Sequence, residues 1–265
     1  MDVVRERFRP DPSLTRQEME ALQRAVAAAA VFADDHGFDV ARLRAGHGDR
    51  DRAADQQSLG AGEAPVVAGV DQAFDGEDAV SAVVALRAGE VVAEASARVP
   101  TGMAYVPGLL SFREAPAVVA ALESLPVDPD CLLVDGSGRI HFRQAGLATH
   151  VGVLFDLPTA GVAKSLLCGR PRRSLADPLP EGTRVAVEAD EDVDAPSGTV
   201  IGYAYQSRQY PNPERRHVNP LYVSPGHRLS AETAVDVVAA TCAGYKLPEP
   251  TRLADQRAAA LKGED

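Results

Sequence analysis

The sequence predicts an α/β domain built around a mixed β-sheet. Three β-prone runs, at 66–74, 79–87 and 91–99, stand close together with only short turns between them. Further along the chain, short apolar runs alternate with segments of helical periodicity, the order expected for a sheet covered by helices. A chain of 265 residues, 45% of them hydrophobic, can bury the core of one such domain. We therefore expect a single domain over residues 1–265.

The first elements are a helix, a polar insertion and a meander of strands. Thr15 and Glu18 have the spacing of a capping box, and the apolar periodicity that follows predicts a helix over 15–33. Residues 34–62 are polar and charged, which predicts a loosely ordered insertion. The turn at 88–90 joins the second and third β-prone runs as a hairpin.

A helix through Val118 and Leu122 follows the loop at 100–110. Because proline is best tolerated in a first helical turn, Pro116 predicts that Glu114 lies at or just before the helix start. The remaining elements are a strand at 131–134, a helix near 144–154, strands near 159–163, 199–205 and 221–223, a helix from Ser230 to Gly244, and a last helix after 247–250.

The charge does not favour a nucleic-acid-binding protein at first sight. The formal net charge is −11, whereas a protein that binds phosphates is expected to carry basic patches. However, the acidic excess concentrates in segments such as 188–194, away from the basic runs 170–173 and 208–217. Only three lysines occur, and many acids with few lysines suggest adaptation to concentrated salt, which screens surface charge.

Several classes of protein are disfavoured. No apolar run approaches the length of a membrane span, and the first residues are charged, so we expect a soluble, cytoplasmic protein. The three cysteines, Cys131, Cys168 and Cys242, are odd in number and far apart, which argues against a disulfide framework and a zinc site.

Asp71 and Asp135 each interrupt or end an apolar strand. A buried carboxylate is costly unless it is paired or binds a cation, and two on neighbouring strands repel each other unless a cation lies between them. Hard divalent ions such as Mg²⁺ take oxygen ligands of this kind. The alternative, that each aspartate caps a strand end or pairs with an arginine, stays open at this point.

Glu114, His141 and Lys164 are further candidates. Glu114 has the spacing of a capping box with Ser111, but at a helix start it could equally face a metal. The glycines around Asp135 do not form a dinucleotide fingerprint, because His141 holds the third glycine position. Lys164 follows an apolar strand in a chain that otherwise prefers arginine, which suggests that a compact ammonium group is needed there.

Six segments resemble the endonuclease V (deoxyinosine 3′-endonuclease) family. They occur in the family's order between about residues 65 and 257, which marks a catalytic core. The segments are Val-Ala-Gly-Val-Asp (67–71), Tyr-Val-Pro-Gly-Leu-Leu-Ser-Phe-Arg-Glu (105–114), Leu-Val-Asp-Gly-Ser-Gly-Arg-Ile-His (133–141), Thr-Ala-Gly-Val-Ala-Lys (159–164), Asn-Pro-Leu-Tyr-Val-Ser-Pro-Gly-His-Arg (219–228) and Tyr-Lys-Leu-Pro-Glu-Pro-Thr-Arg-Leu-Ala-Asp (245–255).

The resemblance implies a ribonuclease-H-like, three-layer fold with a central mixed sheet whose first three strands are antiparallel. It implies a metal-dependent endonuclease that acts on DNA containing deaminated bases, chiefly deoxyinosine, and cuts the second phosphodiester bond 3′ to the lesion. Segments 34–62 and 186–198 have no counterpart in the family and are expected to be surface insertions. By the same resemblance, Asp71, Asp135 and Glu114 ligate Mg²⁺ or Mn²⁺, Asp255 lies near the metal, Lys164 and His141 lie beside the scissile phosphate, Tyr105 and Pro107 form a wedge, and the backbone at Gly108, Gly136 and Gly138 lines the base pocket.

Three alternatives remain at this stage. The same chemistry could act on inosine-containing RNA, because recognition of a 2′-hydroxyl depends on loop geometry. A flap or junction nuclease of the same fold is a second alternative, since fold does not determine function. A non-catalytic nucleic-acid-binding domain is the third, and the complete set of acidic residues with Lys164 disfavours it. We expect a monomer and no membrane partner.

Overall fold

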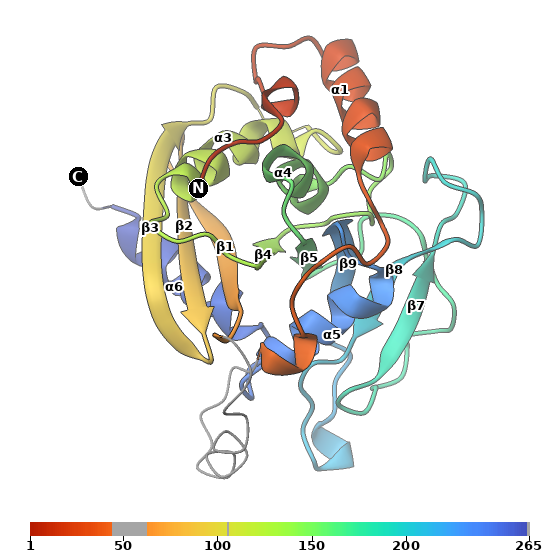
Figure 1. The fold of residues 1–265 in the computed structure, drawn as a ribbon. Helices are drawn as coiled ribbons and strands as arrows, with labels where there is room; N and C mark the ends of the chain where they lie inside the picture. Colours follow the sequence, from red (N-terminus) through yellow and green to blue (C-terminus); the bar gives the residue numbers. More distant parts are fainter. Residues whose placement is uncertain (44–62, 105, 264–265) are drawn as a thin grey trace.

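The computed structural model describes residues 1–43, 63–104 and 106–263 (Figure 1). Within them, nine strands form one sheet in the order β3-β2-β1-β4-β5-β9-β8-β7-β6. The strands are β1 (Val66–Asp75), β2 (Asp78–Arg87), β3 (Glu90–Pro100), β4 (Cys131–Asp135), β5 (Thr159–Ala163), β6 (Arg170–Pro171), β7 (Arg184–Glu188), β8 (Val200–Tyr205) and β9 (Leu221–His227).

The sheet is mixed, as predicted. β1, β2 and β3 form an antiparallel meander, and β4 pairs in parallel with both β1 and β5. β9 runs antiparallel to β5, and β8 runs antiparallel to β9, so β8 points in the same direction as β5. The carboxyl ends of β1, β4, β5 and β8 therefore lie at the same edge of the sheet.

Helices cover both faces of the sheet and give three layers (Figure 1). Because side chains alternate along a strand, Ala68 and Val70 of β1 pack into one core and Val67 packs into the other. The first core is covered by α1 (Arg16–Ala29), α3 (Leu110–Glu123) and α4 (Leu147–Phe155), and the second by α5 (Ala231–Thr241) and α6 (Glu249–Leu261). Three short 3₁₀ helices lie at Glu6–Phe8, Val40–Arg42 and Pro213–Arg215.

Gly69 lets α6 approach the sheet closely. A Cβ atom at this position of β1 would lie only 2.2 Å from the carbonyl carbon of Pro250, in the first turn of α6. No side chain fits in that space, so the start of α6 rests directly on the β1 backbone. This contact determines where the later residues of α6 lie relative to the end of β1.

Local signals in the sequence are reproduced. The Thr15–Glu18 capping box forms at the start of α1, and the Ser230 side chain caps α5 by accepting a hydrogen bond from the Thr233 amide. The three β-prone runs of the meander agree with β1, β2 and β3 to within one residue at each end.

Two predictions about helices are wrong. α3 begins at Leu110 and contains Pro116 in its interior, so Glu114 lies within the helix and not before it. Burial of Phe112 and Val118 outweighs the backbone hydrogen bond that the proline removes. The first helix ends at Ala29 and does not reach residue 33.

The insertions also differ from the prediction. Residues 34–43 are not loosely ordered: the Asp34 carboxylate accepts hydrogen bonds from the Ser230 amide and the Thr233 hydroxyl, and Leu43 is buried in the second core. Residues 44–62 lie outside the described part of the chain. The segment 186–198 is part of the sheet at its start, because 186–188 belong to β7, which pairs with β8.

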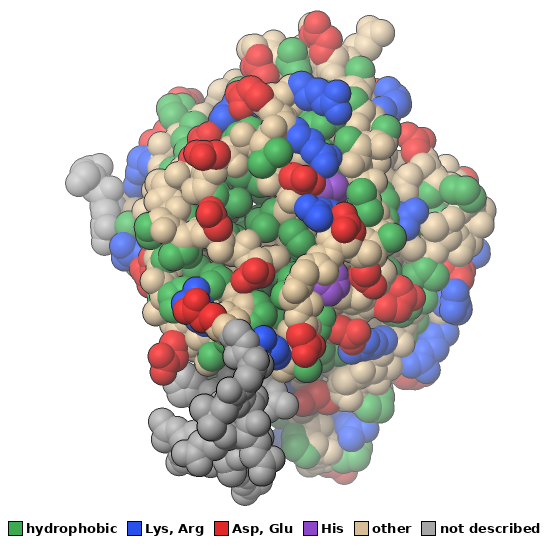
Figure 2. Space-filling model, viewed as in Figure 1, with side chains coloured by type: hydrophobic (Ala, Val, Ile, Leu, Met, Phe, Trp, Pro, Cys, Tyr) green, Lys and Arg blue, Asp and Glu red, His purple; other side chains and the backbone are tan. Residues whose placement is uncertain are grey.

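Charged side chains of both signs are interspersed over the face shown in Figure 2. None of the helices in the described residues is long and apolar enough to cross a membrane.

Candidate active site

Charged residues meet at the sheet edge where β1, β4 and β5 end. Asp71 lies on β1, Asp135 is the last residue of β4, and Lys164 directly follows β5. Val70 pairs with Val134, which puts Asp71 and Asp135 level on neighbouring strands. The Lys164 Nζ atom lies 2.7 Å from Oδ2 of Asp135 and donates a hydrogen bond to it.

Asp71 is a buried carboxyl group in an unfavourable position for a negative charge. Its side chain is only 8% exposed, and its Oδ1 atom accepts a hydrogen bond of 2.7 Å from the Gln72 amide. Burial first, and then the charge of Asp135, raise the pKa of Asp71 to about 8, and contact with the Asp255 carboxyl on α6 adds to the rise. In this structure the group therefore retains its proton near neutral pH.

Glu114 reaches the same edge from α3, on the opposite face of the sheet. Burial and the charge of Asp135 raise the pKa of Glu114 to about 7, while Arg113 and the Gln72 side chain act in the opposite direction. Gln72 follows Asp71 on β1, so the alternation of the strand directs the two side chains to opposite faces. Acidic side chains from the two helical layers, Asp255 on α6 and Glu114 on α3, therefore meet at Asp71 and Gln72 of β1.

Lys164 supplies the positive charge of this cluster. Burial alone would lower the pKa of Lys164, but the hydrogen bond to Asp135 and the negative charges of Asp135, Asp71 and Asp255 outweigh it and raise the pKa. The ammonium group therefore stays protonated at physiological pH. Its side chain is about half exposed, so an incoming anion can reach it.

The cluster has the donor chemistry of a site for a hard divalent cation. Within the described residues, no three histidine, cysteine or carboxylate side chains are close enough in this structure to ligate one ion. However, carboxylates of like charge are forced together at low exposure, and the buried Oε1 atom of Gln72 has no hydrogen-bond partner. A cation would neutralise the repulsion and take oxygen ligands, so the residues fit Mg²⁺ or Mn²⁺.

A pocket lies next to the cluster. Glu114 lines it, so the pocket and the acidic residues share a wall. Gly108, which precedes α3, adopts a φ of +77°, a conformation that favours glycine. The residues that line the pocket are Gly108, Leu110, Ser111, Glu114, Gly136, Ser137, His141, Gly146, Leu147 and Leu167.

His141 is part of this pocket. It is 4% exposed, and its Nε2 atom lies 3.1 Å from the carbonyl oxygen of Gly108. Its Nδ1 atom accepts a hydrogen bond from the Arg143 amide, so Nε2 carries the proton and donates to Gly108. Burial lowers the pKa of His141 to about 4, which keeps the ring neutral. A neutral, buried ring shapes the pocket and carries no charge toward a phosphate.

The structure brings together most of the residues that the sequence predicts. Asp71, Glu114, Asp135, Lys164 and Asp255 interact in one cluster, and Gly108, Gly136 and His141 line the adjoining pocket.

Three predicted residues lie elsewhere or cannot be placed. Gly138 does not line the pocket: its amide donates to the Ser224 hydroxyl, and a Cβ atom there would lie 2.4 Å from the Pro225 carbonyl oxygen. Pro107 is exposed in the turn before α3. Tyr105 lies outside the described residues.

Sequence reasoning missed Gln23 and Gln72. Gln23 is fully buried on α1, and its Nε2 atom donates a hydrogen bond of 2.9 Å to the Gly108 carbonyl, the same oxygen that His141 holds. A glutamine on the apolar face of an amphipathic helix is a signal that could have revealed it. Gln72 has a similar signal, because it directly follows Asp71 in an apolar strand.

Comparison with known proteins gives a consistent result. A family model described as Endonuclease V matches residues 51–256. An endonuclease V from Halobacterium salinarum is 63% identical over 263 residues, which cover 98% of this chain and 100% of the relative. An endonuclease V from Natronomonas pharaonis is 57% identical over 99% of this chain and 98% of its own length.

Solved structures agree with the sequence relatives. The endonuclease V of Streptomyces avermitilis superposes with a TM-score of 0.72 at 33% identity, over 93% of this chain and 92% of that one. Human ENDOV superposes with a TM-score of 0.70 at 32% identity, over 93% and 97% of the two chains. A Ciona intestinalis endonuclease V, solved with DNA containing an inosine followed by a ribo-adenosine, has the same fold at 24% identity and a TM-score of 0.66, over 92% and 96% of the two chains.

Proposed function

This chain belongs to the endonuclease V family, and from that premise we propose that it is a DNA repair endonuclease which recognises deaminated bases, chiefly deoxyinosine. We propose that it hydrolyses the second phosphodiester bond 3′ to the lesion and leaves 3′-hydroxyl and 5′-phosphate ends. The observation that carries the proposal is the acidic cluster with Lys164, which shares Glu114 with a pocket beside it.

Asp71, Asp135 and Glu114 would hold a divalent cation, Mg²⁺ or Mn²⁺, with Asp255 close by. When bound, the cation would supply positive charge that offsets both the carboxylates and the negative charge that develops on the phosphate. Lys164 would contact a non-bridging phosphate oxygen through Nζ and stabilise the same charge. A water molecule attacks phosphorus and the bond to O3′ breaks, which gives the stated ends.

The pocket would receive the deaminated base after it leaves the stack. Extrusion of a base costs a few kcal/mol, and a side chain that fills the gap offsets part of that cost. We propose that Tyr105 and Pro107 fill this gap, and that Gly108 and Gly136 present backbone atoms to the base. His141 supports the pocket wall by donating to the Gly108 carbonyl.

The test is a cleavage assay with purified protein, Mg²⁺ and four end-labelled substrates: duplex DNA and single-stranded RNA, each with and without one inosine. Low and molar salt are compared, and each cut is mapped to the nucleotide. Asp135→Asn is the catalytic control, because it removes a carboxylate of the cluster while changing few atoms. We expect a cut one nucleotide beyond the inosine in DNA, and no cut by the variant.

The other outcomes reassign or refute the function. A cut in inosine RNA alone would make the enzyme an endoribonuclease with the same catalytic residues. Cutting that does not depend on inosine, but depends on strand ends or junctions, would favour the flap or junction alternative. Undiminished cutting by Asp135→Asn would refute the role of the acidic cluster.

We further propose that the enzyme acts as a monomer in the cytoplasm. The three cysteines support this location, since all are free and two of them, Cys131 and Cys168, are buried. Proteins of oxidising compartments more often pair such residues. Size-exclusion chromatography with light scattering tests the oligomeric state, and a dimer would contradict the proposal.

A further inference from the structure

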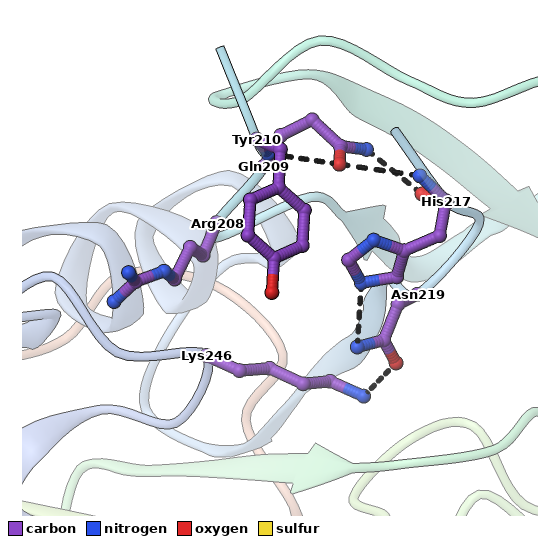
Figure 3. A pocket seen from close by; sticks show the side chains of 6 residues that line it. All are labelled: Arg208, Gln209, Tyr210, His217, Asn219 and Lys246. Carbon is purple, nitrogen blue, oxygen red and sulfur yellow. Dashed lines mark hydrogen bonds between the residues drawn. The ribbon is translucent and has the colours of Figure 1, made fainter. Parts of the chain in front are cut away.

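A second pocket lies outside the acidic cluster (Figure 3). It lies between the connection from β8 to β9 and the loop that precedes α6. Two permanent cations, a histidine and three neutral polar or aromatic residues line it. These six residues are Arg208, Gln209, Tyr210, His217, Asn219 and Lys246.

The charge of this pocket is unusual for the chain. The protein carries a formal net charge of −11, yet among the residues that the structure describes no acidic one lines the pocket. Within the described residues, neither Arg208 nor Lys246 forms an ion pair, and the Lys246 ammonium donates to the neutral Asn219 side chain. In Figure 3 the guanidinium group of Arg208 extends away from the other five side chains. Both cations are thus available to an anion.

Hydrogen bonds hold the pocket in shape. The Gln209 side chain donates to the carbonyl oxygens of Leu179 and His217, at 3.0 and 2.8 Å, and accepts from the His217 amide. Gln209 is buried, so these bonds fasten both ends of the exposed segment 210–217. The Lys246 carbonyl accepts a 2.5 Å bond from the Ser207 hydroxyl, which ties the loop before α6 to the same place.

The pocket opens at the same sheet edge as the acidic cluster. β8 ends at this edge and β9 begins there, so their connection leaves the sheet where β5 ends. Ala163 pairs with Tyr222, which puts Lys164 near the first residue of β9, and Asn219 lies two residues before that strand. Burial, and then the positive charge of Lys164, lower the pKa of Lys246, in agreement with this proximity.

We propose that this pocket binds a backbone phosphate of the nucleic-acid strand that is cut, at a position separate from the scissile phosphate. The inference rests on the proposed nuclease function. Lys246 offers a compact ammonium group to the phosphate, while Asn219 and Tyr210 offer neutral hydrogen bonds. A phosphate there would pair with the Lys246 ammonium, which has no carboxylate partner among the described residues, and would align the strand over the acidic cluster; Arg208, which extends away from the pocket, adds positive charge beside it.

The test measures binding of fluorescently labelled inosine duplexes to protein that carries Asp135→Asn, so that no strand is cut. Each backbone phosphate near the inosine is replaced in turn by a neutral methylphosphonate. Lys246→Met is compared with Lys246→Arg, which keeps the charge, and with Lys262→Met, the same change at an exposed lysine after α6. Lys246→Gln replaces the methionine variant if that variant unfolds at a lower temperature.

We expect Lys246→Met to weaken binding by roughly tenfold to a hundredfold, the value of one hydrogen bond to a charged group. The slope of log affinity against log salt should fall by about 0.9, one phosphate contact. One methylphosphonate position should weaken binding to the parent protein but have no effect in Lys246→Met. Lys246→Arg should recover most of the affinity, and Lys262→Met should not change it.

Two results would overturn the proposal: binding unchanged in Lys246→Met, or weakened binding with every methylphosphonate still effective. In the latter case the binding of inorganic phosphate to the protein is measured with and without nucleic acid. If neither the duplex nor a single strand displaces the phosphate, the pocket binds a free anion and not a backbone phosphate. Failure of the proposed function is seen in the cleavage assay and not in this binding assay. A protein that does not cut inosine strands can still bind nucleic acid and lose one phosphate contact when Lys246 is replaced.

Discussion

Replacing Asp71 with asparagine is expected to stabilise the protein in the absence of metal while it abolishes cleavage. Asp71 is 8% exposed, and burial together with the charge of Asp135 raises the pKa of its carboxyl group from the usual 3.8 to about 8. A carboxyl group whose pKa is higher in the folded than in the unfolded protein destabilises the folded state. This destabilisation grows as the pH rises from the pKa of the unfolded protein to the pKa of the folded protein. The asparagine keeps an oxygen that can accept the hydrogen bond from the Gln72 amide, but it carries no charge.

The size of the effect follows from this shift. The rise of the pKa from 3.8 to about 8 corresponds to a ceiling of about 6 kcal/mol, at 1.36 kcal/mol per pKa unit. Because Asp135 shares the interaction and the site can relax, roughly 2 kcal/mol is the expected gain at pH 8.5. At pH 5 most of the carboxyl groups are protonated in the folded state, so the gain should be well under half of that.

Urea unfolding at pH 5, 7 and 8.5, in EDTA and at constant salt, measures this directly. The difference between variant and parent should grow with pH. Adding Mg²⁺ at pH 8.5 should then stabilise the parent and leave the variant unchanged, since a ligand that binds only the folded state shifts the equilibrium toward it. A variant that is no more stable than the parent at pH 8.5, or a gain that does not change with pH, would refute this account of the cluster.

Four further changes have distinct expected results. Lys164→Met should lower the cleavage rate by about 10²–10³-fold with little change in stability, because the ammonium group stabilises the charge that develops on the phosphate. Single-turnover kinetics measure this rate, and a loss below tenfold would contradict the role of Lys164. Gly138→Ala should destabilise the fold by about 1–3 kcal/mol, since its Cβ would lie 2.4 Å from the Pro225 carbonyl oxygen, and an unchanged urea midpoint would contradict this packing. Gln23→Ala removes one of two hydrogen bonds to the Gly108 carbonyl and should reduce the preference for inosine strands over undamaged strands, measured as the ratio of their kcat/KM values. An unchanged ratio in the variant would show that the turn at Gly108 does not depend on Gln23. Transfer from molar to low salt should lower the unfolding temperature, because a formal net charge of −11 is then less screened, and a constant temperature would exclude salt adaptation.

The acidic cluster was predictable because strand direction brings its members together. Asp71 interrupts one readable apolar run and Asp135 ends another, and parallel pairing of β1 with β4 then sets them level. Lys164 follows from the same logic at the end of β5. In contrast, nothing in the local sequence shows that His141 lines the pocket, because its position depends on a hydrogen bond to Gly108, which lies 33 residues earlier.

The wrong predictions share a cause, since tertiary packing outweighed a local rule. Pro116 would end an isolated helix, but the burial of Phe112 and Val118 on α3 sustains it. β7 was not predicted, and residues 186–198 were expected to be a surface insertion, because the apolar stretch at 185–187 is short and directly precedes acidic residues. β7 becomes a strand by pairing with β8, the next strand in the chain, which begins at Val200.

The close contact between Gly69 and the start of α6 affects the order in which the site can form. α6 follows every other element that the structure describes, yet it supplies Asp255 and rests on the strand that carries Asp71. During synthesis, β1 would leave the ribosome long before this helix, and Asp71 would stay uncovered until α6 docks. A nascent chain that lacks α6 therefore holds an incomplete cluster, so cleavage competence would be acquired only after this helix has been synthesised and has docked on β1.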